Sequence, residues 1–370
     1  MTEFPLSLPA QVLRANPPKR VAIVDDSATM RRWLRHVLEK DKRLCVVAEA
    51  SDAQQARAVI KTYKPDVITL DIEMPGMDGL EFLQRLMRLH PLPVVMVSST
   101  TTRGSDAGVR ALSLGAVDCL VKPTNTQSNT AQREMCRRVF SAACCCVSAP
   151  ARSVPNDPHD QAFPTDGPMP IILMGASTGG VAAIETVLRG LHPNGPPVVI
   201  VQHMPGSFLV SFSNMLDKKL AQTVGLLRNG VALHRGQIML APALDRQHAG
   251  VTRLGGLWIG TLTPATGHNP YCPSADALFG SALAYGADVM AVLLTGLGRD
   301  GAQGLKDLRE AGARTVGQDQ FSSTVYGMPR AAWELGAVER QLPLDRIGPA
   351  LNQLVALHAA AWREWSNPAE

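Results

Sequence analysis

Short apolar runs rich in β-branched residues alternate with amphipathic stretches along the first third of the chain. The apolar runs are RVAIVD, LCVVAEA, DVITLD, LPVVMVSS and GAVDCLVKP. Between them, stretches such as ATMRRWLRHVLEK and GLEFLQRLMRLH place apolar residues three and four positions apart, as amphipathic helices do. Buried strands that alternate with helices predict a parallel sheet covered on both faces. We therefore predict an α/β domain with five parallel strands over residues 19–137, after a loose extension at 1–18.

The alternation stops and later resumes. Residues 148–170 contain six prolines and almost no apolar periodicity, and consecutive cysteines precede them, so we predict a linker at 138–168. After it, PIILMG, PPVVIVQH and ADVMAVLLTG are typical of buried strands, and helical patterns accompany them. Between residues 223 and 263, three further runs predict strands or hairpins rather than strand–helix–strand crossovers. We expect a doubly wound α/β domain with an antiparallel addition at 169–360, and a tail at 361–370.

Composition and charge narrow the class of protein. The chain has 370 residues, enough for two domains with cores of their own. Its formal net charge is +4, but from residue 169 onward 15 Lys and Arg accompany 14 Asp and Glu, so the second domain has no basic excess for nucleic acid. No apolar run reaches the roughly 18 residues that span a membrane, and the N-terminus does not resemble a signal peptide. We expect a cytoplasmic protein that does not insert into membranes.

Seven cysteines are scattered along the chain. Cys144, Cys145 and Cys146 are consecutive, a spacing that suits neither an ordinary disulfide nor a C-x-x-C metal site. In a reducing cytoplasm we expect free thiols. The triplet could be modified or bind a metal, but we prefer to interpret it as a chance feature of a loose segment.

Polar residues follow the predicted strands of the first domain. Asp25 and Asp26 follow the first strand, Asp71 the third, Ser98 the fourth and Lys122 the fifth. The carboxyl ends of parallel strands meet at one edge, where open α/β sheets bind ligands. Three carboxylates there call for a cation, and Mg²⁺ suits oxygen ligands and leaves positions for phosphate oxygens. A carboxylate in such a site can attack a phosphoryl donor while the lysine and serine contact the phosphate. In the alternative interpretation, each aspartate only caps a helix.

As a set, these motifs resemble the receiver domain of two-component response regulators. The matching stretches are VDDS, LDIEMPGMDGLEFL, VVMVSS and VKP, within about residues 20–136. The resemblance implies the flavodoxin-like strand order. It also implies that Asp71 is the phosphoacceptor and that Mg²⁺ binds at Asp26 and Asp71, with support from Asp25. The phosphoryl donor would be a partner histidine kinase.

The run IILMGASTGG opens the second domain and contains the pattern G-x-S-x-G. At a strand-to-helix turn this pattern pushes the hydroxyl of Ser177 outward, and N–H groups of the following helix can stabilise an oxyanion. A phosphate loop would need Gly-Lys-Ser/Thr, which is missing here. A serine nucleophile needs a base, and the base needs an orienting carboxylate. His203 follows the second strand and Asp300 the third, so the three together predict a catalytic site, although each alone could be a cap or turn residue.

The chain order of these residues argues against an ordinary lipase or esterase. The α/β-hydrolase fold has its serine first, its acid second and its histidine last. The pairings that would restore this order are Asp300 with His358, and Asp245 with His248 or His268. None of these histidines follows a strong central-strand pattern, so we consider this hydrolase class the weaker alternative.

The second domain resembles the catalytic domain of chemotaxis protein-glutamate methylesterases, the CheB family. The matching stretches are GASTGG, VQHMP, LTGLGRDGA and VYGMPRAA, and receiver, linker and esterase together cover about residues 20–357. The resemblance implies hydrolysis of γ-glutamyl methyl esters on the cytoplasmic domains of chemoreceptors, deamidation of receptor glutamines, a monomer, and no cofactor in the esterase site. It implies the triad Ser177, His203 and Asp300, with Thr178 and Leu297 near the oxyanion and substrate. Leu297 replaces the usual methionine, and the segment TPATGHNPYCPSADALF is unusual for the family.

Two classes of function remain open. In the first, phosphorylation of Asp71 opens access to a triad that the receiver otherwise covers, and a tenfold activation needs only about 1.4 kcal/mol. In the second, the chain is a non-catalytic response regulator, either a transcription factor or a docking adaptor. The lack of a basic recognition helix argues against DNA binding. The serine, histidine and aspartate set argues against an adaptor, so we prefer the enzyme.

Overall fold

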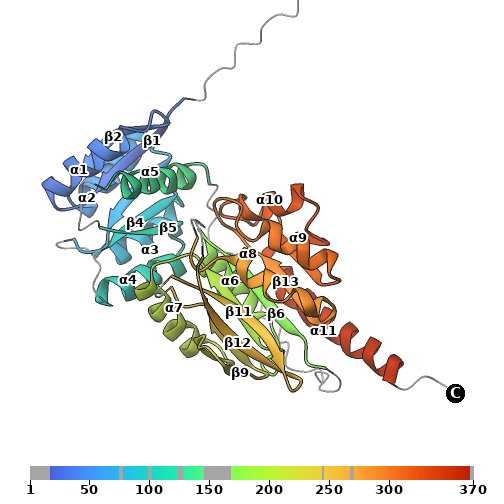
Figure 1. The fold of residues 1–370 in the computed structure, drawn as a ribbon. Helices are drawn as coiled ribbons and strands as arrows, with labels where there is room; N and C mark the ends of the chain where they lie inside the picture. Colours follow the sequence, from blue (N-terminus) through green and yellow to red (C-terminus); the bar gives the residue numbers. More distant parts are fainter. Residues whose placement is uncertain are drawn as a thin grey trace, which may run out of the picture.

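Two α/β domains follow one another along the chain and lie against each other in the computed structural model (Figure 1). The structure describes residues 17–74, 78–98, 102–122, 128–145, 168–243, 246–266 and 271–366. Most of the predicted extension and linker, together with Cys146, and the last four residues of the predicted tail lie outside these ranges. Within the described part, no disulfide joins the cysteines, and no helix is both long and apolar enough to cross a membrane.

The first domain is a parallel sheet with helices on both faces. Its strands are β1 (Lys19–Val24), β2 (Leu44–Ala50), β3 (Val67–Asp71), β4 (Val94–Ser98) and β5 (Asp118–Val121). They pair in the order β2-β1-β3-β4-β5, and every pair is parallel. The helices are α1 (Ala28–Leu38), α2 (Ala53–Tyr63), α3 (Gly79–Leu89), α4 (Thr102–Ser113) and α5 (Asn129–Ala143). The predicted five-stranded, flavodoxin-like domain is confirmed.

The core of this domain has two parts, one on each face of the sheet, because successive side chains of a strand point to opposite faces. Val21 and Ile23 of β1 pack with α1 and α5, whereas Ala22 and Val24 pack with α2, α3 and α4. This division follows from the two-residue period of a strand. The helix α5 continues past residue 137, where the sequence suggested that the linker begins, because its last turns remain buried against the sheet.

The second domain is built on a seven-stranded parallel sheet in the order β15-β14-β13-β6-β7-β10-β8. Its strands are β6 (Ile171–Ala176), β7 (Val198–Gln202), β8 (Thr223–Leu226), β10 (Gln237–Leu240), β13 (Val289–Leu293), β14 (Arg314–Gln318) and β15 (Arg340–Leu342). The helical segments are α6 (Gly180–Arg189), α7 (Gly206–Lys219), α8 (Ala275–Gly280), η2 (Leu283–Asp288), α9 (Ala302–Glu310), α10 (Met328–Glu334) and α11 (Leu344–Ser366). Because β6 lies between β13 and β7, the residues that follow these three strands share one edge.

The predicted antiparallel addition is confirmed as a separate three-stranded sheet. The strands β9 (Val231–Leu233), β11 (Gln247–Leu254) and β12 (Leu257–Pro264) form a separate antiparallel sheet in the order β11-β12-β9. The strands β8 and β10, expected as part of hairpins, instead extend the parallel sheet beyond β7. Strands of four residues are too short to reveal the direction of their partner. The sequence patterns did not predict the strands β14 and β15, because polar residues interrupt their apolar runs.

The two domains pack through α4 of the first and α7 of the second. A Cβ atom at Gly108 of α4 would lie 2.4 Å from Cε1 of Phe208, so the glycine allows a close approach of the two helices. Phe208 is 1% exposed and belongs to an apolar cluster that continues from one domain into the other. The first domain therefore covers part of the second domain near the carboxyl edge of its sheet (Figure 1).

Candidate active site

Ser177 lies in the turn between β6 and α6. Its N–H donates to the carbonyl of Thr295 (3.0 Å), and its carbonyl accepts from the N–H of Gly180 (2.8 Å) and from Nε2 of Gln202 (2.9 Å). These contacts fix the turn. Gly179 has a φ of +79°, and a Cβ at Gly180 would lie 2.0 Å from Oε1 of Gln202. The turn therefore requires glycine at both positions.

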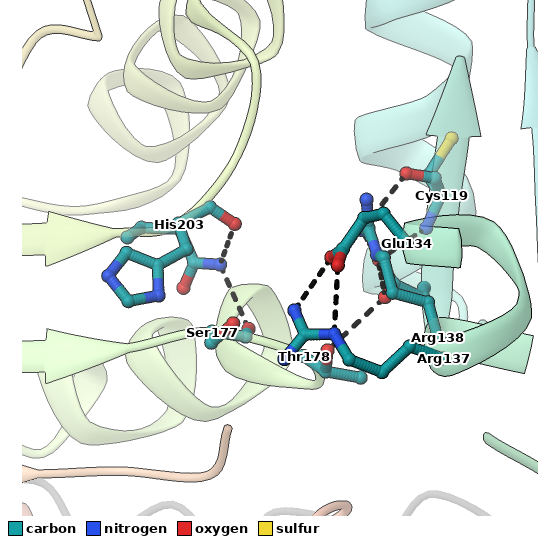
Figure 2. A network of polar contacts seen from close by, with 9 residues as sticks. Cys119, Glu134, Arg137, Arg138, Ser177, Thr178 and His203 are labelled. Carbon is teal, nitrogen blue, oxygen red and sulfur yellow. Dashed lines mark hydrogen bonds and ion pairs between the residues drawn. The ribbon is translucent and has the colours of Figure 1, made fainter. Parts of the chain in front are cut away.

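His203 follows β7 and reaches the same edge of the sheet. Its N–H donates to the carbonyl of Ala176 (3.0 Å), which keeps its backbone next to the Ser177 turn. The amide of Gln202 donates to the carbonyls of both Ser177 and His203, which lie beside each other in Figure 2. The imidazole Nδ1 is buried and has no hydrogen-bond partner in the described part of the chain. This nitrogen is therefore available to accept a proton.

Asp300 binds the other imidazole nitrogen. Its Oδ2 lies 2.8 Å from Nε2 of His203, and the residue is 3% exposed. Burial disfavours the charge, but the hydrogen bonds from His203, from the Ser274 hydroxyl and from the Ala275 N–H outweigh burial and hold the pKa of Asp300 below its usual value. A charged Asp300 fixes the imidazole with its proton on Nε2.

Tyr271 covers one face of the His203 ring, a contact that the sequence did not suggest. The two ring centroids lie 4.8 Å apart, and the ring planes differ by 8°. Tyr271 belongs to the unusual segment before α8, which the sequence marked only by its composition. Nothing in the linear order indicates that this tyrosine meets a histidine at the end of a distant strand.

Thr178 and Leu297 occupy different positions around the turn. Thr178 is buried, and its carbonyl accepts from Oγ1 of Thr295 (3.0 Å). The Thr178 hydroxyl donates to Oδ2 of Asp118 (3.2 Å), which belongs to the first domain. Leu297 is half-buried in the turn that follows β13. The structure therefore places both residues at the edge that carries Ser177.

The first domain accepts hydrogen bonds from two donor groups of the Ser177 turn. The carbonyl of Val117 accepts from the N–H of Gly179 (3.2 Å). Asp118, which accepts from Thr178, is in turn bound by Arg138 of α5, whose Nε lies 2.7 Å from Oδ2 (Figure 2). Two donors beside the candidate nucleophile are thus bound to oxygens of the other domain.

Little space remains between the domains at this point. The cavity lined by Ser177 and His203 on one side and by Asp118 and Arg138 on the other has a volume of about 20 Å³. A cavity needs roughly 10–15 Å³ on this scale to hold one water. The space between the domains on this side of Ser177 therefore holds little more than a single water.

The acidic residues of the first domain form the predicted cluster. One oxygen from each of Asp25, Asp26 and Asp71 lies within 4.8 Å of the others. The Nζ of Lys122 lies 2.6 Å from Oδ2 of Asp71 and 3.3 Å from Oδ2 of Asp25. The structure places the backbone of Ser98 at the end of β4, while its side chain lies outside the described part.

The electrostatics of this cluster favour a cation. Burial raises the pKa of Asp71, and the hydrogen bond from Lys122 offsets this effect only in part. Burial would lower the pKa of Lys122, but its contacts with Asp71 and Asp25 raise it overall. Within the described residues, Oδ2 of Asp25 is buried and has only the 3.3 Å ion pair with Lys122. Three clustered carboxylates with unused oxygen lone pairs fit a hard divalent cation such as Mg²⁺.

Two family descriptions match the chain. The response regulator receiver domain matches residues 21–132, and the CheB methylesterase matches residues 172–351. The chain is 44% identical to protein-glutamate methylesterase/protein-glutamine glutaminase 1 of Caulobacter vibrioides, over 91% of this chain and 98% of that protein. It is 45% identical to the protein of the same name, without the number, from Agrobacterium fabrum, over 90% of this chain and 96% of that protein. It is 43% identical to protein-glutamate methylesterase/protein-glutamine glutaminase 2 of Pseudomonas aeruginosa, over 92% and 97%.

These similarities extend over both domains. The two matched regions coincide with the five-stranded and the seven-stranded sheet of the structure. The curated relatives cover nine-tenths or more of the chain, so they share the order of the two domains as well as each domain. With this fold, and with relatives of more than 40% identity along nearly its whole length, the chain belongs to the CheB methylesterase family.

Proposed function

We propose that this protein is a phosphorylation-activated serine hydrolase that removes methyl esters from glutamates of chemoreceptors and deamidates receptor glutamines. Its relatives carry the names of both activities. The observation that carries the proposal is the 2.8 Å contact between Asp300 and Nε2 of His203, beside the Ser177 turn, with Nδ1 of the same ring available. A serine, an imidazole and a buried carboxylate are the groups that acyl transfer requires.

The reaction begins when Nδ1 of His203 takes the proton of the Ser177 hydroxyl and the oxygen attacks the ester carbonyl carbon. The imidazole then gives this proton to the methoxy group, methanol leaves, and a glutamyl ester remains on Ser177. Water loses a proton to the same nitrogen and attacks the glutamyl ester, which releases the glutamate and restores the serine. Glutamine follows the same path with ammonia as the leaving group. Asp300 keeps Nε2 protonated and stabilises the imidazolium.

The groups at the start of α6 would stabilise the oxyanion. In the closed arrangement, the N–H of Gly179 donates to Val117 and the hydroxyl of Thr178 donates to Asp118. Once the domains separate, both donors become available for the carbonyl oxygen of the substrate. Leu297, in the neighbouring turn, would add an apolar contact to the substrate.

The strand β5 provides a physical connection between the two sites. Its first residue, Asp118, contacts Thr178, and Lys122 immediately after its last residue contacts Asp71. Phosphorylation of Asp71 changes the charge that Lys122 meets, and can thereby shift β5. We propose that this shift weakens the contacts of Val117 and Asp118 with the esterase turn. A tenfold increase in the open form needs about 1.4 kcal/mol.

Phosphorylation itself would use the acidic cluster. Asp26 and Asp71, supported by Asp25, would hold Mg²⁺, which when bound neutralises the carboxylates and the incoming phosphate. Asp71 would attack the phosphoryl group of a histidine kinase, while Lys122 and Ser98 contact the phosphate oxygens. The substrate would be the cytoplasmic domain of a chemoreceptor, and the enzyme would act in the cytoplasm as a monomer.

Methanol release from methylated receptor tests the proposed activity. We expect Ser177→Ala to lower the rate by about 10⁴-fold or more, because a triad without its nucleophile loses most of its catalytic effect. Ser207→Ala is the matched control, because Ser207 is an exposed serine at the start of α7 near the same edge. If Ser177→Ala releases methanol at the rate of the control, Ser177 is not the nucleophile and the proposal fails.

A further inference from the structure

Tyr271 contacts both the candidate base and the receiver domain. Its ring stacks on the imidazole of His203, with 4.8 Å between the centroids. Its hydroxyl also interacts electrostatically with the guanidinium of Arg137, on α5 of the receiver. One side chain of the esterase domain thus connects the receiver to the imidazole.

We propose that Tyr271 is a positioning residue for His203, and that Arg137 holds Tyr271, so that the receiver restrains the base in addition to covering Ser177. This inference rests on the proposed function. A parallel, offset stack is a favourable geometry for two rings and limits rotation of the imidazole.

Adjacent arginines of α5 lie behind the receiver's contacts with the neighbours of both candidate reacting side chains. Arg138 binds Asp118, which accepts from Thr178, the residue next to the nucleophile. Arg137 binds Tyr271, which stacks on the base. Figure 2 shows the two arginines on the receiver side and Thr178 on the esterase side of this contact. Because the arginines are consecutive on one helix, a displacement of α5 changes both contacts together.

Orientation, rather than charge, explains the effect that we assign to Tyr271. The charged or titratable residues around this region include Asp300, Asp276, His248 and Cys272 of the esterase and Arg137, Glu134, Asp118 and Arg138 of the receiver. Arg137 is paired with Glu134 (2.7 Å), and Arg138 is paired with Asp118, so each receiver cation has a nearby anion. The receiver therefore brings little net charge to the imidazole, and the stacked ring is its direct contact.

Two substitutions at residue 271 separate the ring from the hydroxyl. We expect Tyr271→Leu, which removes the ring, to lower kcat of the phosphorylated enzyme by about 10- to 100-fold with little change in KM, because a misplaced base affects the chemical step. Tyr271→Phe keeps the ring, so it should retain kcat in the phosphorylated enzyme. It should instead raise the rate of the unphosphorylated enzyme, because the interaction of the hydroxyl with Arg137 is lost.

The contribution of the receiver is tested from the other side of the contact. Arg137→Gln should raise the unphosphorylated rate as Tyr271→Phe does, and the double variant should be no faster than either single variant, because both remove one interaction. Glu134→Gln removes the ion pair of Arg137 but leaves the interaction of Arg137 with Tyr271, and is the matched control. Additive effects, or the same increase in the control, would overturn the role of Arg137.

Nuclear magnetic resonance gives a readout that does not need esterase activity. The ring of Tyr271 should displace the carbon-bound imidazole protons of His203 upfield. Tyr271→Phe should keep this displacement and Tyr271→Leu should abolish it, while Tyr285→Phe, elsewhere in the same domain, should not affect it.

A wild-type protein without methanol release would refute the proposed function and leave this signal testable. An unchanged signal and kcat in Tyr271→Leu would overturn the inference. If that variant does not fold, a missing upfield displacement in the wild-type protein would overturn it equally.

Discussion

Asp300 illustrates how neighbouring donors decide the state of one buried carboxyl group. It is 3% exposed and accepts hydrogen bonds from His203, Ser274 and Ala275. These bonds keep its pKa below the usual value in spite of burial. For the nearby Asp276, burial raises the pKa of the carboxyl, although it accepts from a backbone N–H. The two groups are displaced in opposite directions, and Asp300 is the one suited to remain charged beside an imidazole.

We predict that Asp300→Asn lowers kcat by about 10⁴-fold with little effect on KM, since an amide at this position favours the wrong imidazole tautomer. Initial rates of methanol release at saturating receptor measure the change. Asp307→Asn, on the outer part of α9, is the control, because its carboxylate bonds only to Gln303 among the described residues. A loss smaller than tenfold would show that Asp300 does not orient the base.

The helix α11 shows how an element far along the chain is fixed to the sheet. Asp288, just before β13, lies 2.8 Å from Nε2 of His358 on α11 and 2.6 Å from the guanidinium of Arg253 on β11. The hydrogen bond from His358 is the largest influence and holds the pKa of Asp288 below its ordinary value of 3.8. One carboxylate thus connects three elements that are remote in the sequence.

Replacing this carboxylate should make stability less dependent on pH. A folded-state pKa below the unfolded value gives a stabilisation that is complete above 3.8 and is lost as the pH falls through the folded value. We expect Asp288→Asn to lower the free energy of unfolding by about 1 kcal/mol at pH 7, because the ion pairs are partly exposed. Thermal unfolding at a series of pH values should show the two melting temperatures converging below pH 3.8. A gap of constant size over the whole series would contradict this account.

In the molecule as a whole, the interface between the domains lies beside the turn that carries Ser177. It contains an apolar contact at Gly108 and Phe208 and polar contacts at Val117 and Asp118. Exposing a buried phenylalanine costs about 1.5–3 kcal/mol. This cost is comparable to the 1.4 kcal/mol that separates the resting enzyme from tenfold activation. We therefore expect a modest perturbation of the interface to change the resting rate.

A side chain forced into this interface should activate the enzyme without phosphorylation. Gly108→Leu would place atoms against Phe208, where even a Cβ lies only 2.4 Å from the ring. We expect roughly a tenfold higher resting rate of methanol release and a smaller further increase with beryllofluoride, a phosphate mimic that should act through Asp71. Arg110→Leu, on the exposed side of α4, is the control. A resting rate equal to that of the control would show that this contact does not restrain the enzyme.

Patterns within the sequence determined the class of both domains and most of the proposed site. Apolar runs located the strands of the receiver and the three central strands of the esterase, because a buried strand needs apolar residues on both faces. The residues that follow these strands were then expected to lie close together, since the carboxyl ends of parallel strands share an edge. Ser177, His203, Asp300 and the acidic cluster could be nominated in this way without coordinates.

Only the tertiary structure decided the contacts between segments that no hydrophobic repeat along the sequence connects. Whether β8 and β10 run parallel to their neighbours depends on β7 and on each other, and a strand of four residues does not indicate this direction. Tyr271 contacts His203, and Asp118 contacts Thr178, only because segments that are distant in the sequence fold against the same edge of the esterase sheet. Local propensities act over one element, whereas these contacts depend on how whole layers pack. The sequence therefore nominated the candidate catalytic residues, and the packing of the domains decided which residues surround them.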